Sequence, residues 1–191
     1  MGKYKNANSD SLLFGLPLDK KAKGFRLSEL SAINLTQIAW RNSEAPGKIA
    51  KICGVEFCPE SMTDGAARNG DGSLLPIMPG RALYFSNVGL GESQLKSLRE
   101  LGCYTLDLSA GRTVLTLRGP HCAWTLMKGS GIDFESMRPG STAQTNLFKI
   151  STMVWMIKDN EIRLIVSYAF SRGLAERLLD AGQEHGLRFV G

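Results

Sequence analysis

The stretch Leu108–Phe134, LSAGRTVLTLRGPHCAWTLMKGSGIDF, decides how this chain folds, because it carries the pattern of a strand, a glycine-proline turn and a helix in direct succession. From Thr113 to Arg118 the side chains alternate between two faces, which predicts a half-buried strand. Proline loses no hydrogen bond at the first helical position, so we expect a helix from Pro120 to Lys128. Its inward-facing residues would be Ala123, Leu126 and Met127.

A glycine turn between a strand and a helix is also a common phosphate site, since free amides converge at a helix N-terminus. Here Pro120 removes one of those amides, and neither the dinucleotide pattern nor the P-loop pattern surrounds the turn. We therefore interpret Gly119-Pro120 as scaffolding, with phosphate binding as the alternative.

Composition limits the class of protein. The chain has 191 residues and is 43% hydrophobic, so it can bury a sizeable core as one large domain or as two packed halves. No apolar N-terminal stretch resembles a signal peptide or a membrane span, and the cysteines are scattered, which predicts a cytoplasmic protein without a membrane partner. Cys53 and Cys58 have no histidine at a finger-like spacing, so they predict no metal site.

The net charge of +5 arises from 23 basic and 18 acidic residues. The tight basic cluster is Lys20, Lys21 and Lys23, and no aromatic residue is interleaved with it as a stacking platform. We therefore expect a solvated arm and no nucleic-acid partner.

The chain divides into three parts. Residues 1–24 form a polar N-terminal arm, whose apolar patch Leu12–Leu18 would dock onto a neighbour, and residues 25–108 and 109–191 form two α+β halves packed against each other. In the first half we expect strands at 35–41, 81–86 and 103–109, helices at 46–53 and 93–101 with Ser93 as the cap, and a flexible glycine-rich loop at 65–73.

The predicted order of the first half is β-α-(β)-β-α-β, and the second half repeats this order with one extra strand. After the opening stretch we expect strands at 145–151, 152–158 and 161–167, with a turn at Asp159-Asn160. A helix over 170–184 would end at Gly186, and residues 187–190 would close a sheet. The pattern predicts an α+β chain of two βαββαβ-like halves, that is split βαβ units, with mixed or antiparallel sheets.

Few residues are candidates for catalysis. His121 would lie in the first turn of the central helix, where the helix dipole favours the neutral ring, but no partner for it is predicted. Cys122 would point to a different helix face, and no nucleophile elbow is present. Asp107, Asp133 and Glu135 could support acid–base work, although carboxylates at strand ends and in loops are usually only solvated. The residues thus predict no catalytic, cofactor-binding or metal-binding site on this chain.

Three segments carry a family resemblance: LDLSAGRTVLTLRGPHCAWTLMKGSGIDF (106–134), RPGSTAQTNLFKISTMVWMI (138–157) and LIVSYAFSRGLAERLLDAG (164–182). Over roughly Leu27–Gly186 the chain resembles the gamma subunit of heterotetrameric sarcosine oxidase. The most specific parts are the GRTVL…GP strand and turn, PGSTAQT from Pro139 to Thr145, and the final helix led by aromatic residues. Cys122-Ala123-Trp124 and the first 24 residues depart from the family pattern.

The resemblance implies a fold similar to the folate-binding aminomethyltransferase domain of the glycine cleavage system. It implies a small subunit, itself non-catalytic, that supports assembly of a flavoenzyme. That enzyme oxidatively demethylates sarcosine to glycine and formaldehyde, or to methylenetetrahydrofolate, and makes hydrogen peroxide. FAD, FMN, NAD, zinc and tetrahydrofolate would lie on the partner alpha, beta and delta subunits, with no cofactor on this chain.

Two alternatives remain open. The first is a subunit of a related complex that oxidises another N-methylated amino acid. The second is a stand-alone folate-dependent one-carbon transferase, for which Asp107 or Asp133 would be the acid near the folate. Trp40, Trp124 and Trp155, spread one per element, favour core or interface anchoring over a cofactor site.

Overall fold

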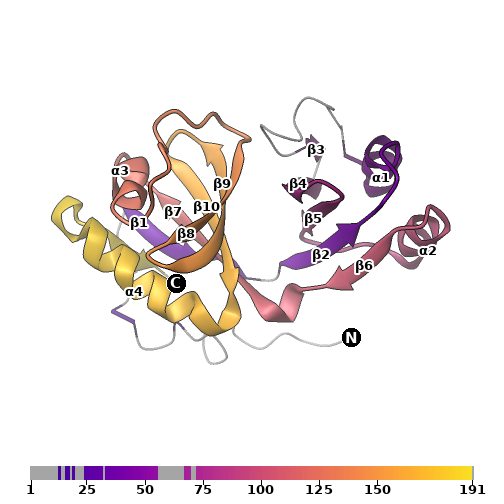
Figure 1. Cartoon of the computed structure of the whole chain (residues 1–191). Coiled ribbons are helices and arrows are strands. Elements are labelled where there is room, and N and C mark those ends of the chain that lie inside the picture. Colours follow the sequence, from indigo (N-terminus) through magenta and orange to yellow (C-terminus); the bar gives the residue numbers. More distant parts are fainter. Residues whose placement is uncertain are drawn as a thin grey trace. The chain divides into compact units, whose positions relative to one another are not determined.

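The computed structural model describes residues 13, 16, 17, 19, 24–31, 33–55, 67–69 and 72–190, with only the backbone for 67–69. The basic cluster at 20–23 and Cys58 lie outside the described residues. The chain forms two compact units, one of Ala32–Arg112 with Pro139–Ala143 and the other of the remaining residues. Figure 1 labels their helices and strands, and each unit is described by itself.

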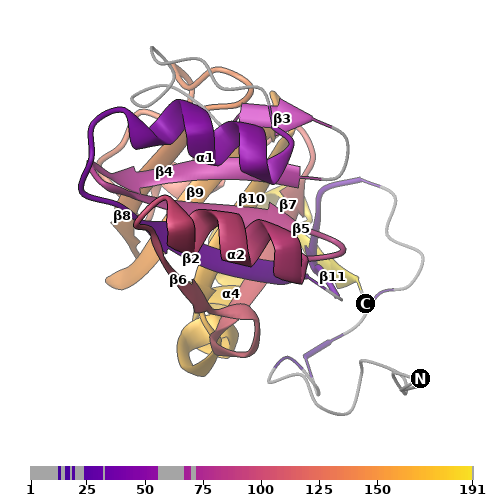
Figure 2. The ribbon, with the colours of Figure 1, turned by 90° about the vertical axis from the view of Figure 1, so that its right-hand side faces the viewer.

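The first unit contains the small sheet, which has the order β3-β4-β5-β2-β6 in the described part of the chain. Its strands are β2 (Asn34–Ala39), β3 (Ala67–Asn69), β4 (Gly72–Met78), β5 (Arg81–Ser86) and β6 (Tyr104–Asp107). Its helices are α1 (Ala45–Cys53) and α2 (Glu92–Glu100). Both helices lie across the same face of the sheet (Figure 2).

The connection from β2 through α1 to β4 is a split βαβ unit. β5 pairs antiparallel with β2 on one side and with β4 on the other, so β2 and β4 run parallel with β5 between them. The core between this sheet and its helices includes Ile38, Ile49, Ala82 and Leu98.

The second unit contains the large sheet, with the order β11-β1-β7-β10-β9-β8 among the described residues. Its strands are β1 (Arg26–Glu29), β7 (Arg112–Arg118), β8 (Thr142–Leu147), β9 (Ile150–Lys158), β10 (Glu161–Ser167) and β11 (Arg188–Val190). Its helices are α3 (Cys122–Met127) and α4 (Ser171–Gly182). Their core includes Leu27, Leu117, Leu126, Phe134, Val154, Leu174 and Leu178.

The two units share one topology. With β1 left aside, each runs strand, helix, three strands, helix, strand, and each sheet has the order second, third, fourth, first and fifth strand. This is the predicted βαββαβ plan with one added strand in each unit, so the predicted α+β fold class is confirmed. The compact units do not follow the sequential halves 25–108 and 109–191, because β1 inserts between β7 and β11 of the large sheet.

Several sequence-based boundaries were wrong. The described part of the predicted 65–73 loop lies in β3 and the start of β4, which pair with each other. α2 begins at Glu92 rather than after a Ser93 cap, and the Gly91 amide donates to Oε1 of Gln94 at 2.9 Å. α3 begins at Cys122, two residues after Pro120, which lies in the preceding turn.

Burial also differs from expectation in two places. β7 is not half-buried, because every residue from Thr113 to Leu117 is buried. Leu13, from the apolar patch expected to dock onto a neighbour, is buried in the core of the large-sheet unit, and Leu16 packs against it. The chain's own core therefore covers these two leucines.

The strand predicted at 145–151 contains a two-residue turn at Phe148-Lys149, which joins β8 to β9. Both residues have positive φ, 50° and 67°, a geometry that usually selects Asn-Gly. The Phe148 amide donates to the Gly129 carbonyl at 2.8 Å, and Arg177 Nη1 donates to the Phe148 carbonyl at 2.9 Å. These contacts stabilise a turn that the residue types Phe and Lys do not predict.

Two glycines of α4 provide a matched test of packing. A Cβ added at Gly173 meets no atom within 4 Å, whereas one added at Gly182 lies 2.6 Å from Leu187 Cδ2 and 3.1 Å from Phe25 Cε1. Alanine at 173 should raise the free energy of unfolding by about 0.5–1 kcal/mol through helix propensity. Alanine at 182 should lower it by about 1–3 kcal/mol through overpacking. Urea unfolding of the two variants measures the difference, and equal shifts would contradict the packing described.

Candidate functional site

Both backbone polar groups of Gly119, in the Gly119-Pro120 turn, form hydrogen bonds within the chain. The Gly119 amide donates to the Asn160 carbonyl at 3.0 Å, and the Gly119 carbonyl accepts from Cys122 Sγ at 3.1 Å. Gly119 has φ 136°, and an added Cβ would lie 2.8 Å from the Phe25 Cα. Backbone geometry and close packing therefore account for this glycine without a ligand.

The chain's two histidines lie against each other, although no partner was predicted for His121. The His121 ring, just before α3, stacks on the His185 ring at 3.8 Å between centroids and 13° between planes. Trp124 meets the same His185 edge to face at 4.5 Å. The two histidines are 64 positions apart, so no local sequence pattern predicts the pair.

Lys128 completes this cluster. Its Nζ lies 3.7 Å from the Trp124 ring centroid, donates to the Ala181 carbonyl at 2.7 Å, and pairs with Glu184. The hydrogen bond from Lys128 lowers the pKa of Glu184, together with the charges of Lys128 and His185. These side chains connect the end of α3 with the end of α4 and the residues that follow it. The contacts of the cluster therefore assign it a structural role.

The three described cysteines are free, buried thiols. Burial raises the pKa of Cys122 to about 12, despite the hydrogen bond to Gly119. Burial, and then the charge of Cys103, raise the pKa of Cys53 to about 12, and burial raises the pKa of Cys103 as well. A thiol at such a pKa is protonated at neutral pH and is a poor nucleophile.

An ion pair that was not predicted joins Arg118, at the end of β7, to Glu161, at the start of β10. Their atoms Nη2 and Oε1 lie 2.8 Å apart, and the Glu161 side chain is only 14% exposed. Burial alone would raise the pKa of Glu161, but the hydrogen bond and charge of Arg118, with the charges of Arg163 and Lys158, hold it below its usual value. The pair joins two neighbouring strands of the large sheet.

Glu161→Gln should lower the free energy of unfolding by about 1 kcal/mol at neutral pH. Because the folded-state pKa of Glu161 is depressed, its contribution is present above the unfolded value near 4.5 and is lost as the pH falls below it. Urea unfolding at neutral pH and at acid pH tests this. In the control Glu176→Gln, which breaks a half-exposed pair with Arg172, the loss should be smaller.

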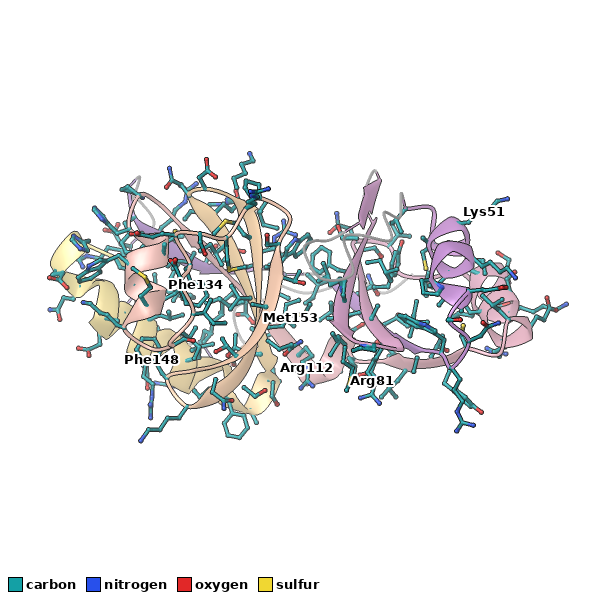
Figure 3. All side chains as sticks on the ribbon, turned by 45° about the horizontal axis from the view of Figure 1, so that its top comes forward. Lys51, Arg81, Arg112, Phe134, Phe148 and Met153 are labelled. Carbon is teal, nitrogen blue, oxygen red and sulfur yellow. The ribbon has the colours of Figure 1, made fainter. Side chains whose placement is uncertain are left out.

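A row of side chains lies at one end of the small sheet, on the face away from α1 and α2. The rest of this face includes four buried residues, Leu35, Leu75, Leu83 and Phe85. We call Tyr104, Ala39, Arg81 and Met78 the Tyr104 row, because Tyr104 pairs with Ala39, Ala39 with Arg81, and Arg81 with Met78 on successive strands. Tyr104 is 71% exposed and Met78 is 53% exposed. Figure 3 labels Arg81 in this row, and Lys51 on α1.

Leu106 extends the exposed surface along β6. It is 55% exposed, and by strand alternation it lies on the same face as Tyr104. The five large apolar side chains exposed in the described part of the chain are Met78, Val88, Tyr104, Leu106 and Phe170. Three of them therefore lie on this face, which makes it the strongest candidate interaction surface.

The fold of this chain is similar to the folds of known proteins. No family model and no curated protein sequence matches the chain. The structure is similar to heterotetrameric sarcosine oxidase from Corynebacterium sp. U-96 in complex with pyrrole 2-carboxylate, with TM-score 0.71 and 23% identity over 83% of each chain. It is also similar to glycine cleavage system aminomethyltransferase T from Bartonella henselae, with TM-score 0.61 and 14% identity.

The chain has an aminomethyltransferase-like fold. The second match covers 88% of this chain but 48% of the aminomethyltransferase, so this chain spans about half the length of that protein. The resemblance predicted from the sequence is confirmed at the level of the fold.

Of the predicted acid–base carboxylates, Asp107 lies in the small-sheet unit of this aminomethyltransferase-like fold, and Asp133 and Glu135 lie in the large-sheet unit. Asp107, in the small-sheet unit, accepts from the Ser109 hydroxyl at 2.6 Å and amide at 2.9 Å, and these bonds lower the pKa of Asp107. Asp133, in the large-sheet unit, accepts from the amides of Glu135 and Ser136 at 3.1 and 3.3 Å. Both carboxylates stabilise local turns.

Among the residues that the structure describes, no group of three or more histidine, cysteine, aspartate or glutamate side chains could hold a metal ion. In the same part of the chain, no helix combines the length and the apolar character needed to cross a membrane.

Proposed function

We propose that this chain is the small gamma-type subunit of a heterotetrameric sarcosine oxidase and that it supports assembly of the flavoenzyme without being catalytic itself. The observation that carries this proposal is the likeness of fold to heterotetrameric sarcosine oxidase over 83% of both chains. In this proposal the chain works in the cytoplasm with alpha, beta and delta subunits. FAD, FMN, NAD, zinc and tetrahydrofolate would be held by those partners.

Two features of the described residues support a role in assembly. The carboxylates of Asp107 and Asp133 are engaged in local turns, and the buried thiols are held in the protonated form. The small sheet, by contrast, exposes the Tyr104 row and Leu106, an apolar surface of the kind that marks protein contacts.

The test is purification of the tagged full-length chain from its own source under native conditions. We expect larger chains in stoichiometric amounts and sarcosine-dependent formation of hydrogen peroxide by the eluate. If another N-methylated amino acid gives the faster rate, the chain belongs to a related oxidase. A chain that elutes alone, without oxidase activity, would contradict the proposal.

The likeness to aminomethyltransferase T favours one second candidate, a stand-alone folate-dependent one-carbon transferase. That function requires a carboxylate available to the folate, and in Asp107 and Asp133 the Oδ1 atom accepts hydrogen bonds from loop donors. Calorimetric titration of the purified chain with tetrahydrofolate decides the matter. If the chain binds tetrahydrofolate and Asp107→Asn or Asp133→Asn abolishes the binding, the result would support the transferase. If the unaltered chain does not bind tetrahydrofolate, neither residue acts as the acid near a bound folate.

A further inference from the structure

In the described part of the chain, β6 is an edge strand of the small sheet, and β2 is the strand paired with it. The Leu108 amide donates to the Leu35 carbonyl at 2.8 Å, which fixes the phase of the ladder with β2. By alternation, the amides and carbonyls of Thr105 and Asp107 point away from β2. The strand carries no proline and no lysine, two of the devices that block pairing at an edge.

The same edge is apolar on one face. Tyr104 and Leu106 occupy alternate positions of β6, so a strand added beside it would place every second side chain against them. Val88, the most exposed of the large apolar side chains at 83%, follows β5 and lies outside β6 and the Tyr104 row.

Arg81 sets the chemistry of the partner. It is exposed in the middle of the Tyr104 row, and among the described residues it has no ion-pair partner. Covering this guanidinium with apolar groups alone would leave a buried unpaired charge, which is strongly unfavourable. Arg81 lies two strands from β6, roughly 10 Å away, so the carboxylate that meets it comes from residues that cross the face.

We propose that β6 and the Tyr104 row bind a segment of a larger oxidase subunit. This segment adds to β6 as a strand, covers Tyr104 and Leu106 with apolar side chains, and continues across the face to place a carboxylate on Arg81. The inference rests on the proposed function, because it takes the larger oxidase chains as the partners.

The test uses the tagged full-length chain in its own source, with photo-reactive benzoylphenylalanine in place of Leu106. We expect crosslinked peptides from a larger chain, with alternating apolar residues and an aspartate or glutamate nearby. The matched control carries the same group in place of Val88 and should give no such crosslink. Crosslinks from the Leu106 position to a second copy, or to this chain's own residues, would overturn the proposal.

Substitutions separate this surface from the function itself. Leu106→Asp and Arg81→Glu should each reduce the larger chain recovered per tagged chain by about tenfold, whereas Val88→Asp should leave it unchanged. Replacing the crosslinked aspartate or glutamate of the larger chain by lysine should restore recovery of that chain with the Arg81→Glu variant. Thermal melting checks that each variant is folded. Full recovery of the larger chain with both variants would overturn the proposed docking surface but not the proposed oxidase role. If the unaltered chain recovers no flavin-bearing chain, the docking surface and the oxidase role are both overturned.

Discussion

Replacing Gly119 by valine is expected to lower the free energy of unfolding by about 3 kcal/mol or more. Gly119 has φ 136°, a backbone conformation that a β-branched residue does not adopt without strain. An added Cβ would also lie 2.8 Å from the Phe25 Cα, a backbone atom that cannot move aside as a side chain can. Assembly with larger chains should be lost together with the fold.

Urea unfolding of the full chain measures this effect, and two controls separate its causes. Gly140 also has positive φ, 96°, but an added Cβ there meets nothing within 4 Å, so Gly140→Ala should cost about 1–2 kcal/mol from the backbone alone. Gly111 has open space and no positive φ, so Gly111→Ala should be within about 0.5 kcal/mol of the parent. Unchanged stability of Gly119→Val would mean that the turn is wrongly described.

The second large effect is expected for Phe134→Ala, which should lower the free energy of unfolding by about 3–5 kcal/mol. Phe134 lies in the irregular segment between α3 and β8, yet it is fully buried in the core of the large-sheet unit. Figure 3 labels it there, together with Phe148. Its removal leaves a cavity among residues of the sheet and α3.

The control is Phe170→Ala in the same unit. Phe170 is 59% exposed, so its truncation should change stability by about 0.5 kcal/mol or less. Thermal and urea unfolding of both variants give the comparison. Similar losses for the two phenylalanines would contradict the assignment of Phe134 as the anchor of this segment.

The sequence predicted the elements whose side chains follow a clear period. Alternation located β7, β10 and the two residues Asp159-Asn160 of the turn between β9 and β10, and Gly186 ends the last helical segment with φ 74°. The repeated order of elements was enough to predict two βαββαβ-like halves. Local patterns therefore carried most of the fold.

What the sequence missed depends on partners far away in the chain. Phe148-Lys149 adopts a turn because Gly129 and Arg177 hold it, and neither is close in sequence. The stacked histidines were likewise missed because they are distant from each other in the sequence. Tyr104 was placed in a strand, but its exposure depends on the position of β6 at the sheet edge, which no local pattern encodes.

In the proposed function this chain is a subunit of a flavoenzyme. Native mass spectrometry of the complex purified through this chain, together with its visible absorption spectrum, tests this role. We predict one copy of this chain bound to larger chains and flavin absorption bands in the same particle. A colourless particle that contains only this chain would contradict the account.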